Sequence, residues 1–232
     1  MNKIKVLAII PAREGSKRVQ KKNFRPFAGT TLSNLAIEQA KASTLIDKIV
    51  VNSDSIEVLS IAKTYREIFT LERPKLLAQD ESPAIEYMLQ TVNELEKNGE
   101  YFDLIVIIQP SSPLRSGKDI DQTIQLLIDN YDASSAVSVV KLSHMVHPHK
   151  LKVMNGITLD PFLINEGQAT AAHELPDIYV RNCAVYVFKT ENLKKGVTYG
   201  HQCIGFEMPE ETSVDINEMI EFKFAEYLFM NK

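Results

Sequence analysis

One stretch decides the fold of this chain and the place of its ligand site: Ile9-Ile10-Pro11-Ala12-Arg13-Glu14-Gly15-Ser16-Lys17-Arg18-Val19-Gln20-Lys21-Lys22-Asn23. It follows an apolar run and precedes a segment with helical spacing, so the pattern predicts a strand, a basic loop and a helix. Between positions 13 and 25 the loop carries six basic residues and one acid, although the whole chain has a formal net charge of -4. Ligands of open α/β sheets bind at loops that follow the carboxyl ends of strands. The loop therefore predicts an anion site, and a triphosphate matches its charge.

Two common phosphate-binding loops are excluded, because Gly15 is the only glycine in this stretch. Neither G-x-x-x-x-G-K-[ST] nor G-x-G-x-x-G can be drawn through it. A phosphate cradle here must consist mainly of side chains. The alternative is that the lysines and arginines form a solvated face, and composition alone does not separate the two interpretations.

Composition indicates an ordinary globular protein. With 232 residues, 44% of them hydrophobic, the chain can bury an ample core as one domain, or as one domain with a small appendage. No apolar run approaches membrane-spanning length, and Cys183 and Cys203 are too few for a disulfide framework, so we expect a cytoplasmic protein without membrane partners. The pI near 5.8 argues against a nucleic-acid partner.

The segment after the basic loop continues an α/β pattern. Helical spacing near 32–40 and a β-branched run at 48–52 predict a helix and a strand, and 56–65 and 68–71 predict a second pair. A polar loop then runs from Arg73 to Ser82, and Pro83 opens a clear helix. Ser82 is well placed as the N-cap of that helix, with Pro83 at its first position.

A second polar loop follows the apolar run at 104–108, which has the pattern of a central parallel strand. The loop reads Gln109-Pro110-Ser111-Ser112-Pro113-Leu114-Arg115. We expect it to lie over the same ligand crevice as the basic loop. The alternative is a proline-rich turn that leads into a helix at 118–130.

The sequence pattern changes after a strand expected at 135–140. Residues 141–176 form short alternating pieces, with a hairpin turn at Asn155-Gly156, and predict an inserted β-rich flap. The spacing of His144, His147 and His149 fits no standard zinc site, so we do not expect a metal there.

Two further segments complete the chain. Residues 180–188 alternate as a strand, whose simplest role is in the core of the sheet. Residues 213–217 precede a terminal helix, which either Ser213 or Asp215 can cap. The residues expected to share the apolar face of this helix are Ile216, Met219, Ile220, Phe224, Tyr227 and Leu228.

Several of these segments carry a family resemblance. The basic stretch, the Arg73 to Ser82 loop, the Gln109 to Arg115 loop, the strand around Asn182 and the Val214-Asp215-Ile216-Asn217 segment resemble motifs of the acylneuraminate cytidylyltransferases, with the CMP-KDO synthetases as more distant relatives. The resemblance implies a single domain over 1–232: a mostly parallel, doubly wound, Rossmann-like nucleotidyltransferase sheet. It also implies that the 141–176 flap reaches across a homodimer.

The same resemblance implies a reaction between CTP and an α-keto acid sugar of the nonulosonic class, which yields a CMP-sugar and pyrophosphate with Mg²⁺ as cofactor. The residues expected to be catalytic are Arg13, Lys17, Lys22, Gln109 and Asp215. Those expected to bind substrate are Ser16, Asn23, Arg73, Ser82, Ser111, Asn182 and Tyr186. Asp215 and Asn217 are the expected metal ligands. No general base can be named.

Three positions depart from the family pattern. Asn217 stands where the family has a second aspartate, which removes a negative charge from the metal site, and Cys183 stands where glycine is usual. The 169–176 segment lacks the arginine that sialic acid enzymes use to pair with the sugar carboxylate. This departure leaves the sugar open among N-acetylneuraminic, pseudaminic, legionaminic and other nonulosonic acids. The alternatives are a CMP-KDO synthetase, another sugar nucleotidyltransferase, or a CTP-binding protein that has lost turnover.

Overall fold

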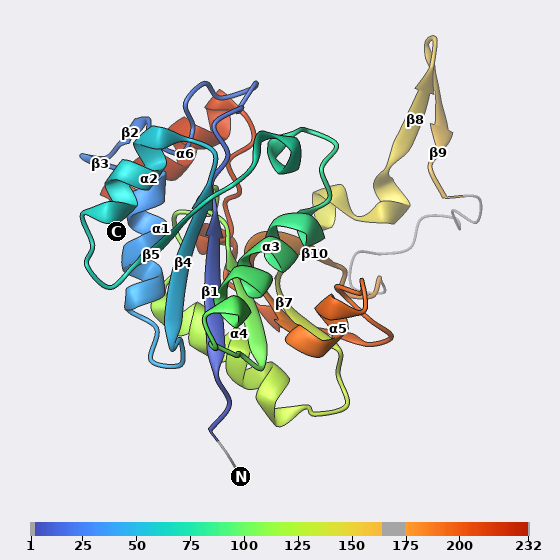
Figure 1. The fold of residues 1–232 in the computed structure, drawn as a ribbon. Coiled ribbons are helices and arrows are strands. Elements are labelled where there is room, and N and C mark those ends of the chain that lie inside the picture. The colour runs from blue at the N-terminus through green and yellow to red at the C-terminus, as the bar shows by residue number, and fades with distance from the viewer. Residues whose placement is uncertain (1–2, 164–174, 232) are drawn as a thin grey trace.

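The first apolar run forms strand β1 (Val6–Pro11) near the middle of a seven-stranded sheet (Figure 1). The computed structural model describes residues 3–163 and 175–231. Strand β1 pairs in parallel with β4 (Lys48–Ser53) on one side and with β6 (Leu104–Ile108) on the other. Every residue of β6 is buried, as its continuous apolar run requires.

The sheet is mostly parallel, as the sequence predicts. In spatial order its strands are β11 (Cys203–Glu207), β7 (Ser135–Lys141), β10 (Tyr179–Lys189), β6, β1, β4 and β5 (Phe69–Glu72). Only β10 among these runs antiparallel to its neighbours, β6 and β7. The carboxyl ends of β1, β4 and β6 therefore lie at one edge of the sheet, where the two polar loops begin.

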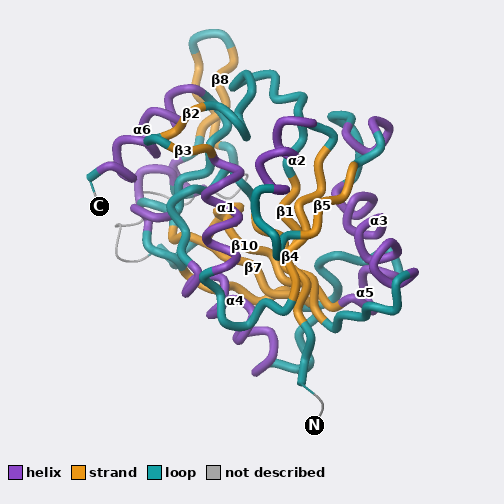
Figure 2. The backbone as a smooth tube through the Cα atoms, turned by 60° about the vertical axis from the view of Figure 1, so that its left-hand side comes forward, coloured by secondary structure: helices purple, strands orange, loops and turns teal. Residues whose placement is uncertain are grey.

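Helices cover both faces of the sheet, which confirms the doubly wound architecture (Figure 2). The helices α1 (Leu32–Lys41), α2 (Ile56–Lys63) and α4 (Gly117–Asp129) pack on one face. The helices α3 (Ala84–Lys97) and α5 (Thr190–Lys194) pack on the other. None of the helices in residues 3–163 and 175–231 combines the length and apolarity needed to cross a membrane.

The predicted N-cap role of Ser82 is wrong. Helix α3 begins at Ala84, and Pro83 is its N-cap residue without any side-chain cap. The Ser82 hydroxyl instead donates to the Leu76 carbonyl over 2.8 Å, because a 3₁₀ turn, η1 (Lys75–Ala78), brings that carbonyl close. The serine therefore stabilises the loop rather than the helix.

The predicted hairpin in the insertion is confirmed. Strands β8 (Lys152–Asn155) and β9 (Thr158–Pro161) pair antiparallel and stand away from the sheet (Figure 1). Gly156 has a φ of 64°, the left-handed conformation that such a tight turn needs. At the base of the flap, His147 is buried and its Nε2 donates to the Pro176 carbonyl over 3.1 Å.

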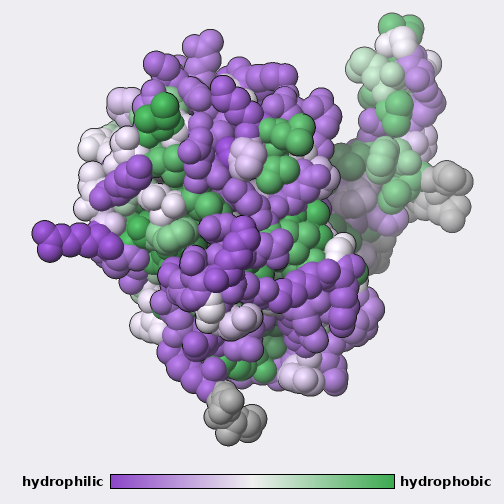
Figure 3. Space-filling view, in the orientation of Figure 1, coloured by the Kyte–Doolittle hydropathy of each residue, from purple (hydrophilic) through white to green (hydrophobic). Residues whose placement is uncertain are grey.

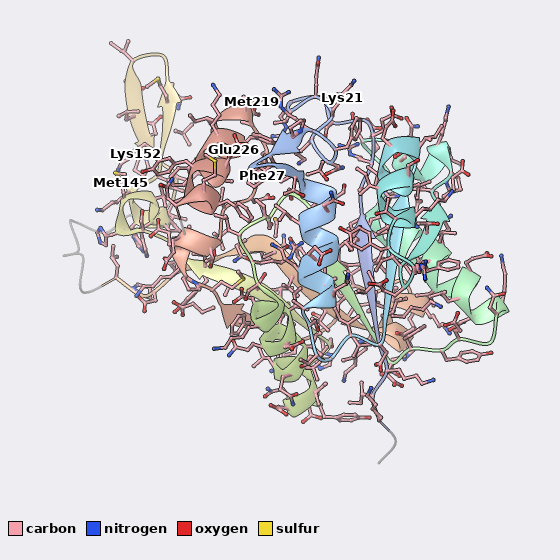
Figure 4. All side chains as sticks on the ribbon, turned by 90° about the vertical axis from the view of Figure 1, so that its left-hand side faces the viewer. Lys21, Phe27, Met145, Lys152, Met219 and Glu226 are labelled. Atoms are coloured by element: carbon pink, nitrogen blue, oxygen red, sulfur yellow. The ribbon has the colours of Figure 1, made fainter. Side chains whose placement is uncertain are left out.

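The predicted apolar face of the terminal helix is wrong in part. Helix α6 (Met219–Met230) buries Phe222 and Ala225, whereas Ile220 and Phe224 are exposed. The reason is a tertiary contact: Phe27, on the small hairpin of β2 (Pro26–Phe27) and β3 (Thr30–Thr31), packs edge-on against Phe222 with ring centroids 5.3 Å apart. Figure 4 shows Phe27 beside α6. Both stripes of the helix are apolar, so periodicity could not select the buried one.

Candidate functional site

The basic loop after β1 is held in place by buried polar contacts. Asn23 is 5% exposed, and its amide nitrogen donates to the Arg13 carbonyl over 2.9 Å. The Asp54 carboxylate, at the end of β4, accepts from the Glu14 backbone amide over 2.9 Å. Val19 is buried and anchors the middle of the loop. With these anchors fixed, the charged side chains of the loop face a cavity.

That cavity has a volume of about 410 Å³ and lies where the loops after β1 and β6 meet. Eight of the expected site residues line it: Arg13, Ser16, Lys17, Lys22, Asn23, Gln109, Ser111 and Asn217. The Ser111 carbonyl accepts from the Ile216 amide over 2.8 Å, which brings the segment before α6 to the same place. The structure thus assembles residues from three distant parts of the sequence.

Two cations of the loop share one carboxylate. Arg13 Nη1 donates to Asp80 Oδ1 over 2.5 Å, and Lys17 Nζ pairs with Asp80 Oδ2. The hydrogen bonds from Lys17 and Arg13 hold the pKa of Asp80 below its usual range, and Asp80 in turn raises the pKa of Lys17. Asp80 and Lys17 therefore both stay charged at neutral pH.

Lys22 lies deeper in the cavity. Its Nζ donates to the Ile216 carbonyl over 2.8 Å. Burial lowers the pKa of Lys22, and the nearby Asp215 carboxylate opposes that shift. No carboxylate in the described part of the chain pairs directly with Lys22, and a partly buried cation of this kind is well suited to bind an anionic group.

A second cavity of about 230 Å³ adjoins the first, and Arg13, Asp80 and Gln109 line both. Arg73 and Ser82 both line this second cavity. It also contains Tyr87, whose pKa burial raises to about 12, so that its hydroxyl stays protonated.

Arg73 is held rigidly. It is 5% exposed, and its Nε and Nη2 donate to Asn52 Oδ1 over 2.6 Å and to the Asn52 carbonyl over 3.1 Å. Its guanidinium carbon lies 4.3 Å from the centre of the Tyr87 ring. The geometry fits a guanidinium that is preorganised to present its remaining donors.

A third cavity of about 290 Å³ lies on the α3 side and contains Tyr186, Phe188 and Tyr199. Gln109 lines all three cavities. Its carbonyl accepts from the buried Arg115 Nη1 over 2.5 Å, and burial lowers the pKa of Arg115 to about 9. Arg115 also donates to the Ala184 carbonyl over 3.2 Å, which joins the end of β6 to β10.

The segment before α6 tests the expected metal site. Asp215 Oδ1 is buried, and no hydrogen-bond donor among the described residues reaches it, which leaves this carboxylate oxygen able to bind a cation. Asn217, by contrast, donates from Nδ2 to Asp215 Oδ2 over 2.9 Å, and its Oδ1 accepts from Arg18 over 3.4 Å. Asp215 therefore fits a Mg²⁺ ligand, whereas the Asn217 amide oxygen, the atom that would bind a metal, already accepts a hydrogen bond from Arg18.

The described residues do not supply a full set of metal ligands. Within the described ranges, no three side chains of the His, Cys, Asp or Glu type gather as a metal-binding group. Magnesium in nucleotide sites usually has one or two carboxylates, phosphate oxygens and water as ligands. The arrangement around Asp215 is compatible with that pattern.

Asn182 is not among the residues that line these three cavities. It is 4% exposed, its Oδ1 accepts from Ser138 over 2.6 Å, and its Nδ2 donates to Ser213 over 2.9 Å. These bonds hold the irregular part of β10, where Cys183 has a φ of 61°. A left-handed backbone explains why glycine suits this position, and here cysteine adopts it.

Several residues of the site were not predicted. Asp80 belongs to the Arg73 to Ser82 loop, but nothing in the sequence pairs it with Arg13 and Lys17. Asp54 and Arg115 act through backbone groups, which leave no pattern in a sequence. The segment 169–174, where the family arginine is missing, lies outside the described residues.

Comparison with known proteins agrees with this geometry. The profile of a family described as cytidylyltransferase matches residues 7–221. The chain belongs to the cytidylyltransferase family. This confirms the family resemblance and the nucleotidyltransferase class inferred from the motifs.

Three relatives extend the comparison. A post-translational flagellin modification protein B of Campylobacter coli is 29% identical, over 98% of this chain and 96% of the relative. A CMP-N,N'-diacetyllegionaminic acid synthase of Campylobacter jejuni is 28% identical, over 98% and 96%. An N-acylneuraminate cytidylyltransferase of Escherichia coli is 27% identical over 95% of this chain, which spans only 51% of that longer protein.

A solved structure shares the fold of this cytidylyltransferase. It is a CMP:2-keto-3-deoxy-manno-octonic acid synthetase complexed with CTP, with a TM-score of 0.73 and 14% identity, over 98% of this chain and 99% of that one. This likeness confirms the expected α/β fold.

Proposed function

We propose that this cytidylyltransferase couples CTP to a nonulosonic acid and releases pyrophosphate. The observation that carries the proposal is that Gln109 lines all three cavities. The first is the basic cavity, the second is the cavity that contains Arg73, and the third is the aromatic cavity that contains Tyr186 and Phe188. We assign the triphosphate to the first, cytosine to the second and the sugar to the third. Gln109 then lies beside the point where the sugar and the α-phosphate meet.

The chemistry follows from this placement. The anomeric hydroxyl of the sugar attacks the α-phosphorus and gives up its proton to water, and the bond from that phosphorus to the oxygen bridging the β-phosphate breaks. Arg13, Lys17 and Lys22 neutralise the charge that collects on the departing pyrophosphate. Asp215 would hold Mg²⁺, which when bound supplies further positive charge to the phosphates.

The sugar is assigned to the nonulosonic class and no further. Support comes from relatives named for N-acylneuraminate and for N,N'-diacetyllegionaminic acid. The aromatic cavity agrees with a ligand that has an apolar face, because Tyr186 and Phe188 supply ring surface.

A homodimer is part of the proposal. The flap exposes large apolar side chains, among them Ile157 at 99% and Met154 at 69% exposed, and Figure 3 shows apolar surface on the hairpin. Exposed apolar patches of this kind mark interaction surfaces. Sedimentation of the purified protein tests this, and a monomer across the micromolar range would refute it.

A cytoplasmic location is also proposed, since Cys183 and Cys203 are both unpaired, as expected in a reducing compartment.

The deciding experiment measures pyrophosphate release with CTP and Mg²⁺ against a panel of nonulosonic acids and KDO, with UTP, ATP and GTP as controls. We expect turnover that requires CTP and selects one nonulosonic acid. Preference for KDO would replace the acceptor class. CTP binding without turnover on any acceptor would replace the enzyme proposal with a binding function.

A further inference from the structure

Asp80 is the single carboxylate among the described residues that line the basic cavity. It bridges the guanidinium of Arg13 and the ammonium of Lys17. A negative group of the protein therefore occupies a position between two cations that a phosphate would also use. No part of the proposed reaction needs a carboxylate there.

These contacts are of a kind that a ligand can replace. The side chains of Arg13, Lys17 and Asp80 are 39%, 81% and 35% exposed, so water and salt screen the two ion pairs. A triphosphate carries several negative charges against the single charge of Asp80. It therefore competes well for the same cations, and it would repel Asp80 if that carboxylate stayed.

Internal hydrogen bonds tie the loop around Asp80 together. Gln79 Nε2 donates to the Lys75 carbonyl over 2.7 Å, and the Ser82 amide and hydroxyl donate to the carbonyls of Gln79 and Leu76 over 3.3 and 2.8 Å. Asp80 lines both the basic cavity and the adjoining one, whereas Ser82 lines only the second. Displacement of Asp80 thus shifts a wall of the cavity assigned to the base.

We propose that Asp80 is an internal competitor of the triphosphate: its carboxylate bridges Arg13 and Lys17, and it leaves these two cations when a polyphosphate binds. Its departure moves the 79–82 loop and couples phosphate binding to the shape of the base cavity. The inference rests on the proposed nucleotide function of this site.

Calorimetric titration with inorganic tripolyphosphate and with cytidine tests the proposal in three proteins: the wild type, Asp80→Asn and Glu81→Gln. Glu81 is the matched control, because it is an exposed acid on the same loop that does not line either cavity. Asp80→Asn should bind tripolyphosphate about threefold to tenfold more tightly than the wild type, the range expected when two exposed ion pairs no longer compete. Glu81→Gln should bind like the wild type.

The coupling gives a second readout. In the wild type, tripolyphosphate should change the affinity for cytidine, and in Asp80→Asn this effect should be smaller, because the loop is already released. Equal or weaker tripolyphosphate binding by Asp80→Asn, in a protein whose wild type binds CTP, would overturn the inference and make Asp80 a positioning residue for the two cations. Failure of all three proteins to bind tripolyphosphate and CTP would overturn the proposed function as well.

Discussion

Replacement of Lys22 by methionine should separate ligand binding from stability. The substitution removes the donor to the Ile216 carbonyl, a charge-assisted bond for which about 1.5–3 kcal/mol is typical. It also removes a cation whose pKa burial has lowered, and each unit of such a shift represents about 1.4 kcal/mol of cost to the charged form. The two effects have opposite signs, so the free energy of unfolding should change by no more than about 1 kcal/mol.

The same substitution should weaken CTP binding by much more than it changes the free energy of unfolding. Loss of one charge-assisted contact to phosphate costs about 1.5–3 kcal/mol, which corresponds to an increase in Kd of about 10-fold to 150-fold. Titration calorimetry measures the Kd, and urea unfolding of the same sample measures stability. Lys63→Met, an exposed lysine on α2, is the matched control and should alter neither quantity. A Kd for CTP within twofold of the wild type, in a folded Lys22→Met protein, would refute the phosphate-binding role.

The pH dependence of stability provides an independent check on the same residue. The folded-state pKa of Lys22 lies below the ordinary value of 10.5, so between these two values the unfolded chain binds more protons than the folded one. The contribution of Lys22 to stability is therefore unfavourable at neutral pH and becomes less so as the pH rises towards 10.5. Lys22→Met should lack this rise, and identical pH profiles of wild type and variant in urea unfolding would contradict the assignment.

Three further predictions concern the surroundings of the site and the terminal helix. Arg73→Lys loses a fixed, buried guanidinium and should lower the free energy of unfolding by about 1–3 kcal/mol in urea unfolding. The same variant should discriminate less between CTP and UTP in competition assays. Unchanged discrimination would contradict a role of Arg73 in base recognition. Phe222→Ala should cost about 3–5 kcal/mol, whereas Phe224→Ala, on the exposed stripe, should stay within about 0.5 kcal/mol, and equal losses would contradict the buried face described above. Asn217→Asp places a second carboxylate beside Asp215, so Mg²⁺ should raise the Tm of this variant more than that of the wild type, and a Tm insensitive to Mg²⁺ in both proteins would count against the metal site.

The sequence predicted the sheet and the meeting of the two polar loops well, because both depend on local patterns. A buried parallel strand needs a continuous apolar run, and the runs at 6–10 and 104–108 show it directly. The carboxyl ends of parallel strands share one edge of a sheet, so the loops that follow β1 and β6 had to meet there. The residues of the basic loop and Gln109 could therefore be grouped without coordinates.

Other features were decided only by the tertiary structure, since they depend on contacts between segments far apart in the chain. Phe27 selected which of two apolar stripes of α6 is buried, and Asp80 reached across to the basic loop. Asn217 turns its amide nitrogen towards the Asp215 carboxylate and its amide oxygen towards the Arg18 guanidinium. Arg18 is far from Asn217 in the sequence, so no local pattern could predict this orientation. A sequence determines which groups are present, whereas the partner that each polar group finds is set by the packing that brings distant loops together.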